Sequence, residues 1–235
     1  MTNEKMLATI SEIANCLDAD DRKAFDFIIT KQDDFSDIVS IPAMLASLVK
    51  QLREDIVKDE AKKAGRSRQL SAAKRILKSA IKTNKASLTY APIQNNKQCL
   101  CDGYRAVRLT NPISGLSELP ENIEYAVDLD SIVKRSGDMN EIELPDAAKL
   151  SAYIKTYRAE HGKKASKPMF DFGEEYQVVN AEYLLDMLLL IPDAKAYSVK
   201  NKGTSVIYFE NEAGDDGVLL PIHPKRIEVR QKTIL

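Results

Sequence analysis

Few residues of this chain have the types and spacing that catalysis requires. Two neighbouring carboxylates can share general acid and base work, but adjacent acids in polar turns are more often solvated. The chain's carboxylate pairs are Asp215-Asp216, Asp128 with Asp130, and Glu174-Glu175. No nucleophile, glycine-rich phosphate loop or zinc-protease pattern accompanies them. We therefore expect no catalytic residue and no enzymatic activity.

Metal and cofactor chemistry is also not expected. Cys99 and Cys101 lie two residues apart in a predicted strand and would face the same side. A zinc site needs a second Cys or His pair, whereas His161 and His223 are isolated. The triplet at residues 171–173 (DFG) occurs in protein kinases, but no glycine-rich loop or HRD segment accompanies it. We predict structural cysteines, no metal and no cofactor.

Binding of a polyanion is the chemistry that the charges favour. The formal net charge of −1 conceals one basic block. Residues 61–110 carry twelve Lys or Arg against one acid, a net charge of +11. Residues 1–60 carry seven against thirteen, a net charge of −6. Localised positive charge of this kind attracts nucleic acid above all.

The centre of this block is a predicted amphipathic helix over residues 67–82. Its apolar positions recur at helical spacing, and its polar positions carry cations with no acid among them. A solvated helix is stabilised by opposite charges four residues apart, and this helix has none. A face with charges of one sign therefore favours a binding role, and a merely solvated face is the alternative. The predicted DNA-binding residues are Arg66, Arg68, Lys74, Arg75, Lys78 and Lys82, with Arg105 and Arg108 as an extension. Internal hydrogen bonding is the alternative role for Arg105.

The elements that position these cations suggest an α+β fold. Residues 1–65 predict an acidic, helical region, and residues 66–235 a domain of alternating strands and short helices. Within the second part, a hairpin is expected at residues 97–109, where Asp102-Gly103 provides a tight turn. The sequence before it is almost continuously helical, and strands alternate with short helices after it. No apolar run reaches the ~20 residues of a membrane span.

A strand, a short helix and antiparallel strands recur three times, at about residues 68–110, 141–172 and 176–222. The leading strand of the first copy is weak or missing, and the second copy is short. A strand is expected at residues 87–91, after the helix of the first copy. Asn180 is expected to cap the apolar helix of the third copy. Such repetition predicts β-α-β-β-β units built on antiparallel sheet.

Three segments resemble the bacterial sliding clamp, the β subunit of the replicative DNA polymerase. Residues 101–109 (CDGYRAVRL) are similar to its T-D-G-H-R-L-A segment, with Asp102, Gly103 and Arg105 matching. Residues 179–188 (VNAEYLLDML) resemble its F-N-x-x-Y-L-L-D-x-L helix, and residues 218–222 (VLLPI) its closing V-M-P-M-R strand. The resemblance covers about residues 68–224 and identifies the chain as a divergent, shortened relative.

The resemblance implies a protein that touches or encircles double-stranded DNA, or another nucleic acid, with basic helices and performs no chemistry. A clamp subunit has six such units and this chain at most three, and residues 1–60 have no clamp counterpart. A twelve-unit ring would need a homo-oligomer of four copies, whereas a monomer would not encircle DNA.

The alternative function is that of a protein interaction module, an inhibitor or adaptor that acts on a replication or other nucleic-acid machine of a bacterium or phage. The acidic residues 1–60 beside a basic block would suit electrostatic docking. Three cysteines, one of them necessarily unpaired, together with the lack of a signal segment, favour the cytoplasm.

Overall fold

The computed structural model describes residues 41–162, 167–200, 204–223, 233 and 235 of the chain. The helices expected within residues 1–40 and the turn expected at residues 201–203 lie outside these described residues. The chain divides into two compact units, Met1–Ser67 and Arg68–Leu235. This division falls two residues after the end of the region expected at 1–65.

The described part of the first unit, residues 41–67, consists mainly of the helix α3, Ile41–Lys63. The helix ends as the sequence indicates, because Gly65 takes the left-handed conformation with φ of 70°. The Gly65 N–H donates to the Lys62 carbonyl at 3.1 Å, and the Arg66 N–H donates to the Ala61 carbonyl at 2.7 Å. These two bonds satisfy carbonyls that a helix end otherwise leaves without partners.

The second unit is built on a seven-stranded sheet in which every neighbouring pair is antiparallel. The strand order is β1-β2-β3-β9-β8-β7-β4. Its strands are β1 Ile93–Gln94, β2 Lys97–Cys101, β3 Arg105–Leu109, β4 Asn140–Ile142, β7 Lys195–Ser198, β8 Ile207–Glu210 and β9 Asp216–Leu219. A separate antiparallel pair joins β5, Met169–Asp171, to β6, Val178–Asn180. The predicted α+β class is confirmed.

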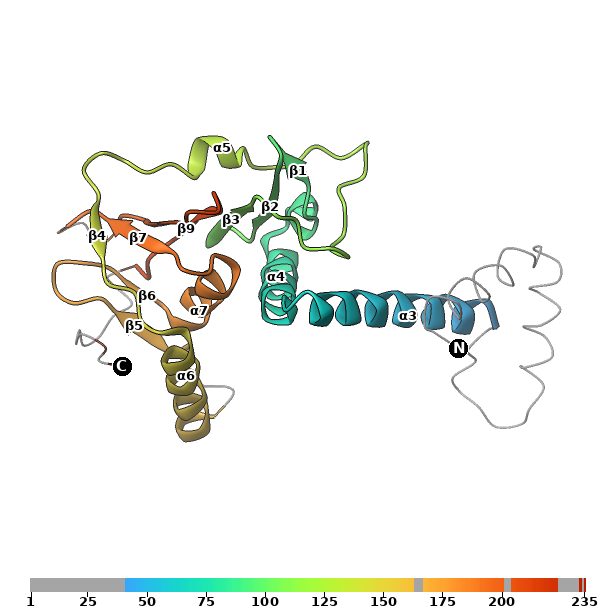
Figure 1. The fold of residues 1–235 in the computed structure, drawn as a ribbon, viewed down its shortest axis with the longest axis horizontal. Helices are drawn as coiled ribbons and strands as arrows, with labels where there is room; N and C mark the ends of the chain where they lie inside the picture. The colour runs from blue at the N-terminus through green and yellow to red at the C-terminus, as the bar shows by residue number, and fades with distance from the viewer. Residues whose placement is uncertain (1–40, 163–166, 201–203, 224–232, 234) are drawn as a thin grey trace. The chain divides into compact units, whose positions relative to one another are not determined.

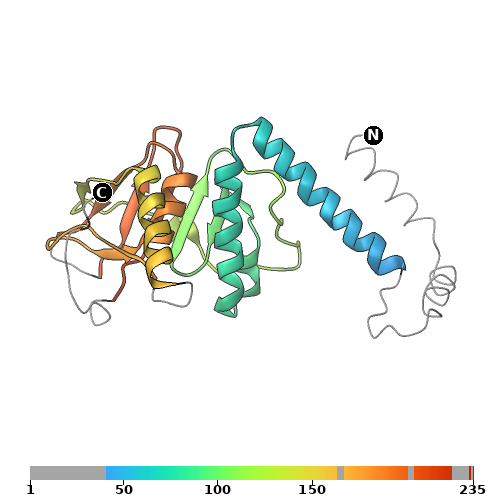
Figure 2. The same ribbon diagram turned by 90° about the horizontal axis from the view of Figure 1, so that it is seen from below.

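Helices α4, α6 and α7 lie on one face of the large sheet and α5 on the other (Figures 1 and 2). Their bounds are α4 Ser67–Ala80, α5 Leu129–Ile132, α6 Ala147–His161 and α7 Ala181–Leu190. Side chains alternate between the two faces along a strand. In β3, Arg105 therefore reaches Asp186 of α7, whereas Arg108 reaches Asp130 of α5 on the opposite face.

The helix starts follow from residues that the sequence places before them. The Asn180 side chain accepts from the Glu182 and Tyr183 N–H groups at 2.9 and 3.3 Å, which confirms the predicted cap of α7. Asp146 caps α6 in the same way, accepting from the Lys149 N–H at 2.9 Å. The caps fix where α6 and α7 begin relative to the strands before them.

Two expected features differ in the structure. The strand expected at residues 87–91 is largely a 3-10 helix, Ala86–Thr89, because the Leu88 N–H bonds locally to the Lys85 carbonyl and Leu88 is buried in the core. The stretch 141–172 holds most of β4, then α6 and β5, but β4 joins the large sheet and β5 the small one. The third copy does contain the expected sequence β6-α7-β7-β8-β9.

Candidate nucleic-acid interface

Helix α4 buries its apolar face and exposes its cations. Leu70, Ala73 and Ile76 are at most 4% exposed against the interior of the second unit. On the other side Arg68 and Lys78 are exposed, and Lys82 follows in a 3-10 turn that extends the helix, Ile81–Thr83. Within the described ranges, these three cations have no ion-pair partner. Their charges are therefore open to an external anion.

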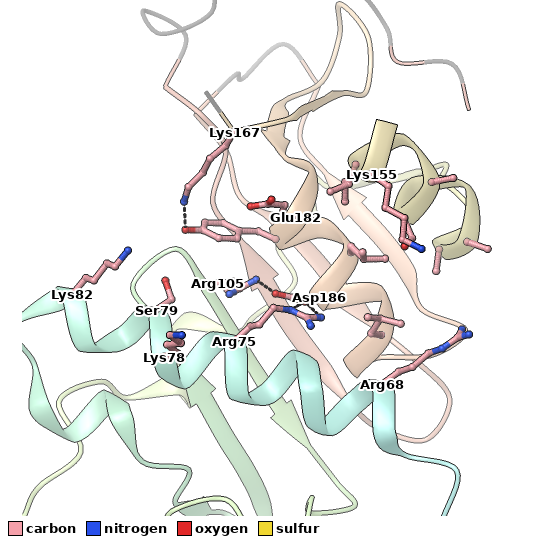
Figure 3. Close-up of a pocket in the computed structure, with 18 residues that line it drawn as sticks. Arg68, Arg75, Lys78, Ser79, Lys82, Arg105, Lys155, Lys167, Glu182 and Asp186 are labelled. Atoms are coloured by element: carbon pink, nitrogen blue, oxygen red, sulfur yellow. Dashed lines mark hydrogen bonds and ion pairs between the residues drawn. The ribbon is translucent and has the colours of Figure 1, made fainter. Parts of the chain in front are cut away.

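The exposed face of α4 forms one wall of a groove of about 860 Å³, whose other wall comes from α6, α7 and the segment before β5. Figure 3 shows basic side chains on both sides of this groove. The buried Arg105 contributes to the lining of the groove. The groove's other basic lining residues are Arg68, Arg75, Lys78, Lys82, Lys155 and Lys167. Its two acidic lining residues, Glu182 and Asp186, are already ion-paired to arginines. The groove is therefore an anion-attracting channel.

The second basic wall was not predicted from the sequence. Lys155 of α6 and Lys167 lie about 75 to 100 residues beyond α4 in the chain. The Lys167 Nζ donates to the Tyr183 hydroxyl at 2.8 Å and lies 4.6 Å from the centre of that ring. A helix containing Lys155 and a basic loop ending at Lys167 are visible in the sequence, but no local pattern places these segments opposite α4.

Arg75 connects α4 to α7. Its Nε donates to Asp186 Oδ1 at 2.7 Å, and its Nη2 makes a second, shorter contact with the same oxygen. The Asp186 side chain is 3% exposed, whereas that of Arg75 is 50% exposed. Arg75 therefore both holds the two helices together and presents part of its guanidinium to the groove.

Arg105 is placed inside the molecule. The residue is 3% exposed and its Nε donates to Asp102 Oδ2 at 3.1 Å, while its Nη1 pairs with Asp186. Asp102 also accepts from the backbone N–H groups of Tyr104 and Arg105, both at 3.0 Å. Arg105 therefore has the alternative role expected for it, internal hydrogen bonding. Its ion pair with Asp186 links β3 to α7.

Arg108 lies on the opposite face of the sheet from α4. Its Nε donates to Asp216 Oδ1 at 2.8 Å, its Nη2 to Asp216 Oδ2 at 2.6 Å, and its Nη1 to Asp130. These bonds raise the pKa of the guanidinium further above its ordinary value. Arg108 could not extend the α4 surface, because residues 105 and 108 point to opposite faces of one strand.

The other two predicted cations, Lys74 and Arg66, are not among the residues that line the groove. Lys74 is half-buried on α4. Arg66 belongs to the first unit, just before α4. The groove thus brings together Arg68, Arg75, Lys78 and Lys82 of the predicted set.

Two of the three carboxylate pairs contain residues with structural contacts, whereas Glu174 and Glu175 are both exposed. Asp215 and Asp216 are each 7% exposed, so the expectation of solvated turn residues was wrong for them. Asp215 accepts from the Thr110 N–H at 2.8 Å, and Asp216 pairs with Arg108 and Lys97. Asp128 caps α5 by accepting from the Asp130 and Ser131 N–H groups. Burial gives Asp215 and Asp216 structural roles, whereas Asp128 is an exposed helix cap.

Cys99 and Cys101 are free thiols buried at one face of the sheet. Burial raises the pKa of the Cys99 thiol to about 11 and also raises that of Cys101. Within the described part of the chain, no group of three or more His, Cys, Asp or Glu residues could hold a metal ion. The two thiols belong to a packed core.

Alkaline pH should weaken the fold through Cys99. The folded state keeps this proton up to about pH 11, whereas the unfolded thiol loses it near pH 9. The free energy of unfolding should therefore fall across this window, by up to roughly 1.4 kcal/mol for each pH unit. Urea titrations between pH 8 and 11 should show a smaller fall for Cys99→Ala than for the natural chain. Equal falls in the two proteins would contradict this origin.

Comparison with known proteins adds no relative: no protein-family model, curated protein or solved structure matches the chain. Among the described residues, no helix is both long and apolar enough to cross a membrane. The functional argument therefore rests on the geometry of the groove and on the residues that line it.

Proposed function

We propose that this chain is a non-enzymatic, DNA-associated protein, like a sliding clamp in the architecture of its second unit, that binds phosphates along the basic groove beside α4. The observation that carries the proposal is the pair of facing basic walls, with Arg68, Lys78 and Lys82 on one side and Lys155 on the other. In the described structure none of these four has an internal ion-pair partner. Phosphate contacts of this kind supply affinity with little reading of sequence.

The same proposal includes location and assembly. A cytoplasmic protein keeps cysteines reduced, and the buried Cys99 and Cys101 are unpaired. The resemblance to sliding clamps supports a role beside a replication machine and assembly of several copies on DNA. The mass of the chain in solution would separate a ring of four copies from a monomer.

Charge reversal in the groove should abolish DNA retention without unfolding the protein. Lys78→Glu with Lys82→Glu is the best pair, because both side chains are exposed and neither has an internal partner among the described residues. Arg75 is a poor choice, since it also joins α4 to Asp186. We expect affinity for a labelled oligonucleotide, measured by fluorescence anisotropy, to fall more than ~10-fold at low salt. The slope of log affinity against log salt should become shallower by about 2.

Lys134→Glu with Lys195→Glu is the matched control, because it changes net charge equally and both residues lie outside the groove lining. This control should lower the affinity only slightly. If both double variants bind with the same affinity and salt slope, the groove is not the binding surface. Recovery of a protein partner that survives nuclease treatment and both reversals would instead support the interaction-module function.

A further inference from the structure

The groove beside α4 has the dimensions of a ligand cleft. Its volume of about 860 Å³ lies within the ~300–1,000 Å³ of clefts that take molecules of small size. A nucleic-acid duplex, with two backbones around stacked base pairs, is too bulky to enter such a cleft. One flexible sugar-phosphate backbone is thin enough to lie along it.

Cations line both walls of the groove, so a single backbone between the walls would have positive charge on both sides. Figure 3 shows Lys78 on α4, Lys82 in the 3-10 turn that follows it, and Lys155 on α6. Lys167 also lines the groove, with its Nζ donating to the Tyr183 hydroxyl. A duplex resting on the outer surface of α4 would leave the charges of Lys155 and Lys167 without phosphates. A single strand between the walls would neutralise both sets.

An exposed aromatic ring stands beside the groove. Tyr104, in the turn between β2 and β3, is 55% exposed, and its ring centre lies 5.9 Å from that of Tyr183. Tyr183 lines the groove, where the Arg105 guanidinium lies 4.2 Å from the centre of its ring. The buried arginine thus fixes Tyr183, and Tyr183 supports Tyr104. An exposed tyrosine beside a basic channel is a platform on which an unpaired base can stack.

We infer that the groove binds single-stranded nucleic acid, with phosphates between the cations of α4 and those of α6 and Lys167, and with a base stacked on Tyr104. This inference rests on the proposed function and specifies that the groove accepts single-stranded, not double-stranded, nucleic acid. Bases in a duplex are already stacked and paired, so a duplex cannot offer one to Tyr104.

Binding of the full chain to labelled dT and U oligonucleotides of about twenty nucleotides, and to a duplex of equal length, tests the inference. We expect the single strands to bind at least ~10-fold tighter than the duplex. Tyr104→Ala should weaken single-strand binding about tenfold with an unchanged salt slope, because stacking releases no counterions. Tyr104→Phe keeps the ring and should bind as the natural chain does.

The natural chain contains no tryptophan, so Tyr104→Trp introduces a unique fluorophore at the proposed stacking position. Its emission should be quenched on addition of dT oligonucleotide. Ile93→Trp is the control, since Ile93 is 56% exposed on β1 and does not line the groove. Its emission should stay constant.

The outcomes separate this inference from the proposed function. Duplex binding as tight as single-strand binding, or an undiminished affinity of Tyr104→Ala, would overturn the inference and leave the proposed function standing. Absence of binding to every oligonucleotide at low salt would overturn both.

Discussion

Asp186→Ala is expected to destabilise the second unit by about 3 kcal/mol. Asp186 is 2% exposed and joins Arg75 of α4 to Arg105 of β3. Its removal leaves the buried Arg105 guanidinium with Asp102 as its only carboxylate in the described structure, and it removes the ion pairs that link α7 to α4 and to β3. Breaking one side of a buried ion pair costs more than the pair contributes, because the remaining charge stays out of water.

Urea titration followed by tyrosine fluorescence measures this loss selectively, since all nine tyrosines lie in residues 68–235. Arg75→Ala is the matched control, because it removes the partner whose side chain is half exposed. That variant should lose no more than about 1 kcal/mol. A loss of similar size in both variants would show that the interaction with α4, and not the buried pair with Arg105, is what Asp186 contributes.

Local signals predicted the fold where they agreed with the packing. Asn180 before an apolar run marked the start of α7, and Gly65 after two lysines marked the end of α3. The expected strand at residues 87–91 failed because tertiary packing outweighed its β-like composition. Ser87, buried in this segment, accepts a hydrogen bond from the Ala126 N–H at 3.0 Å, a loop contact that no local pattern reveals.

Half of the candidate interface could be predicted from the sequence. The single-sign face of α4 was visible as a run of lysines and arginines without an acid. Composition alone could not separate cations that face water from those, such as Arg105, that carboxylates hold inside. Strand periodicity could have shown that Arg105 and Arg108 face opposite ways. Lys155 and Lys167 join α4 only through the tertiary fold.

Gly217→Ala is the second substitution with a large expected effect on stability. Gly217 lies in β9, where α7 crosses the sheet closely. A Cβ there would lie 2.6 Å from the Ala106 carbonyl oxygen of β3 and 2.7 Å from the Met187 Cε of α7. The carbonyl belongs to the β3–β9 ladder, so it cannot move away without loss of strand pairing. We expect a loss of about 2–3 kcal/mol in the free energy of unfolding.

Gly137→Ala provides the control for this substitution, because a Cβ at that position meets nothing within 4 Å. It should be neutral, or slightly stabilising through the smaller conformational freedom of the unfolded chain. The Gly217→Ala variant should also lose nucleic-acid affinity in proportion to its unfolded fraction, since α7 supplies Tyr183 and Asp186 to the groove. A Gly217→Ala protein as stable as Gly137→Ala would mean that α7 can move away from the sheet at little cost. The separation of the groove walls would then be adjustable and could not discriminate a single strand from a duplex.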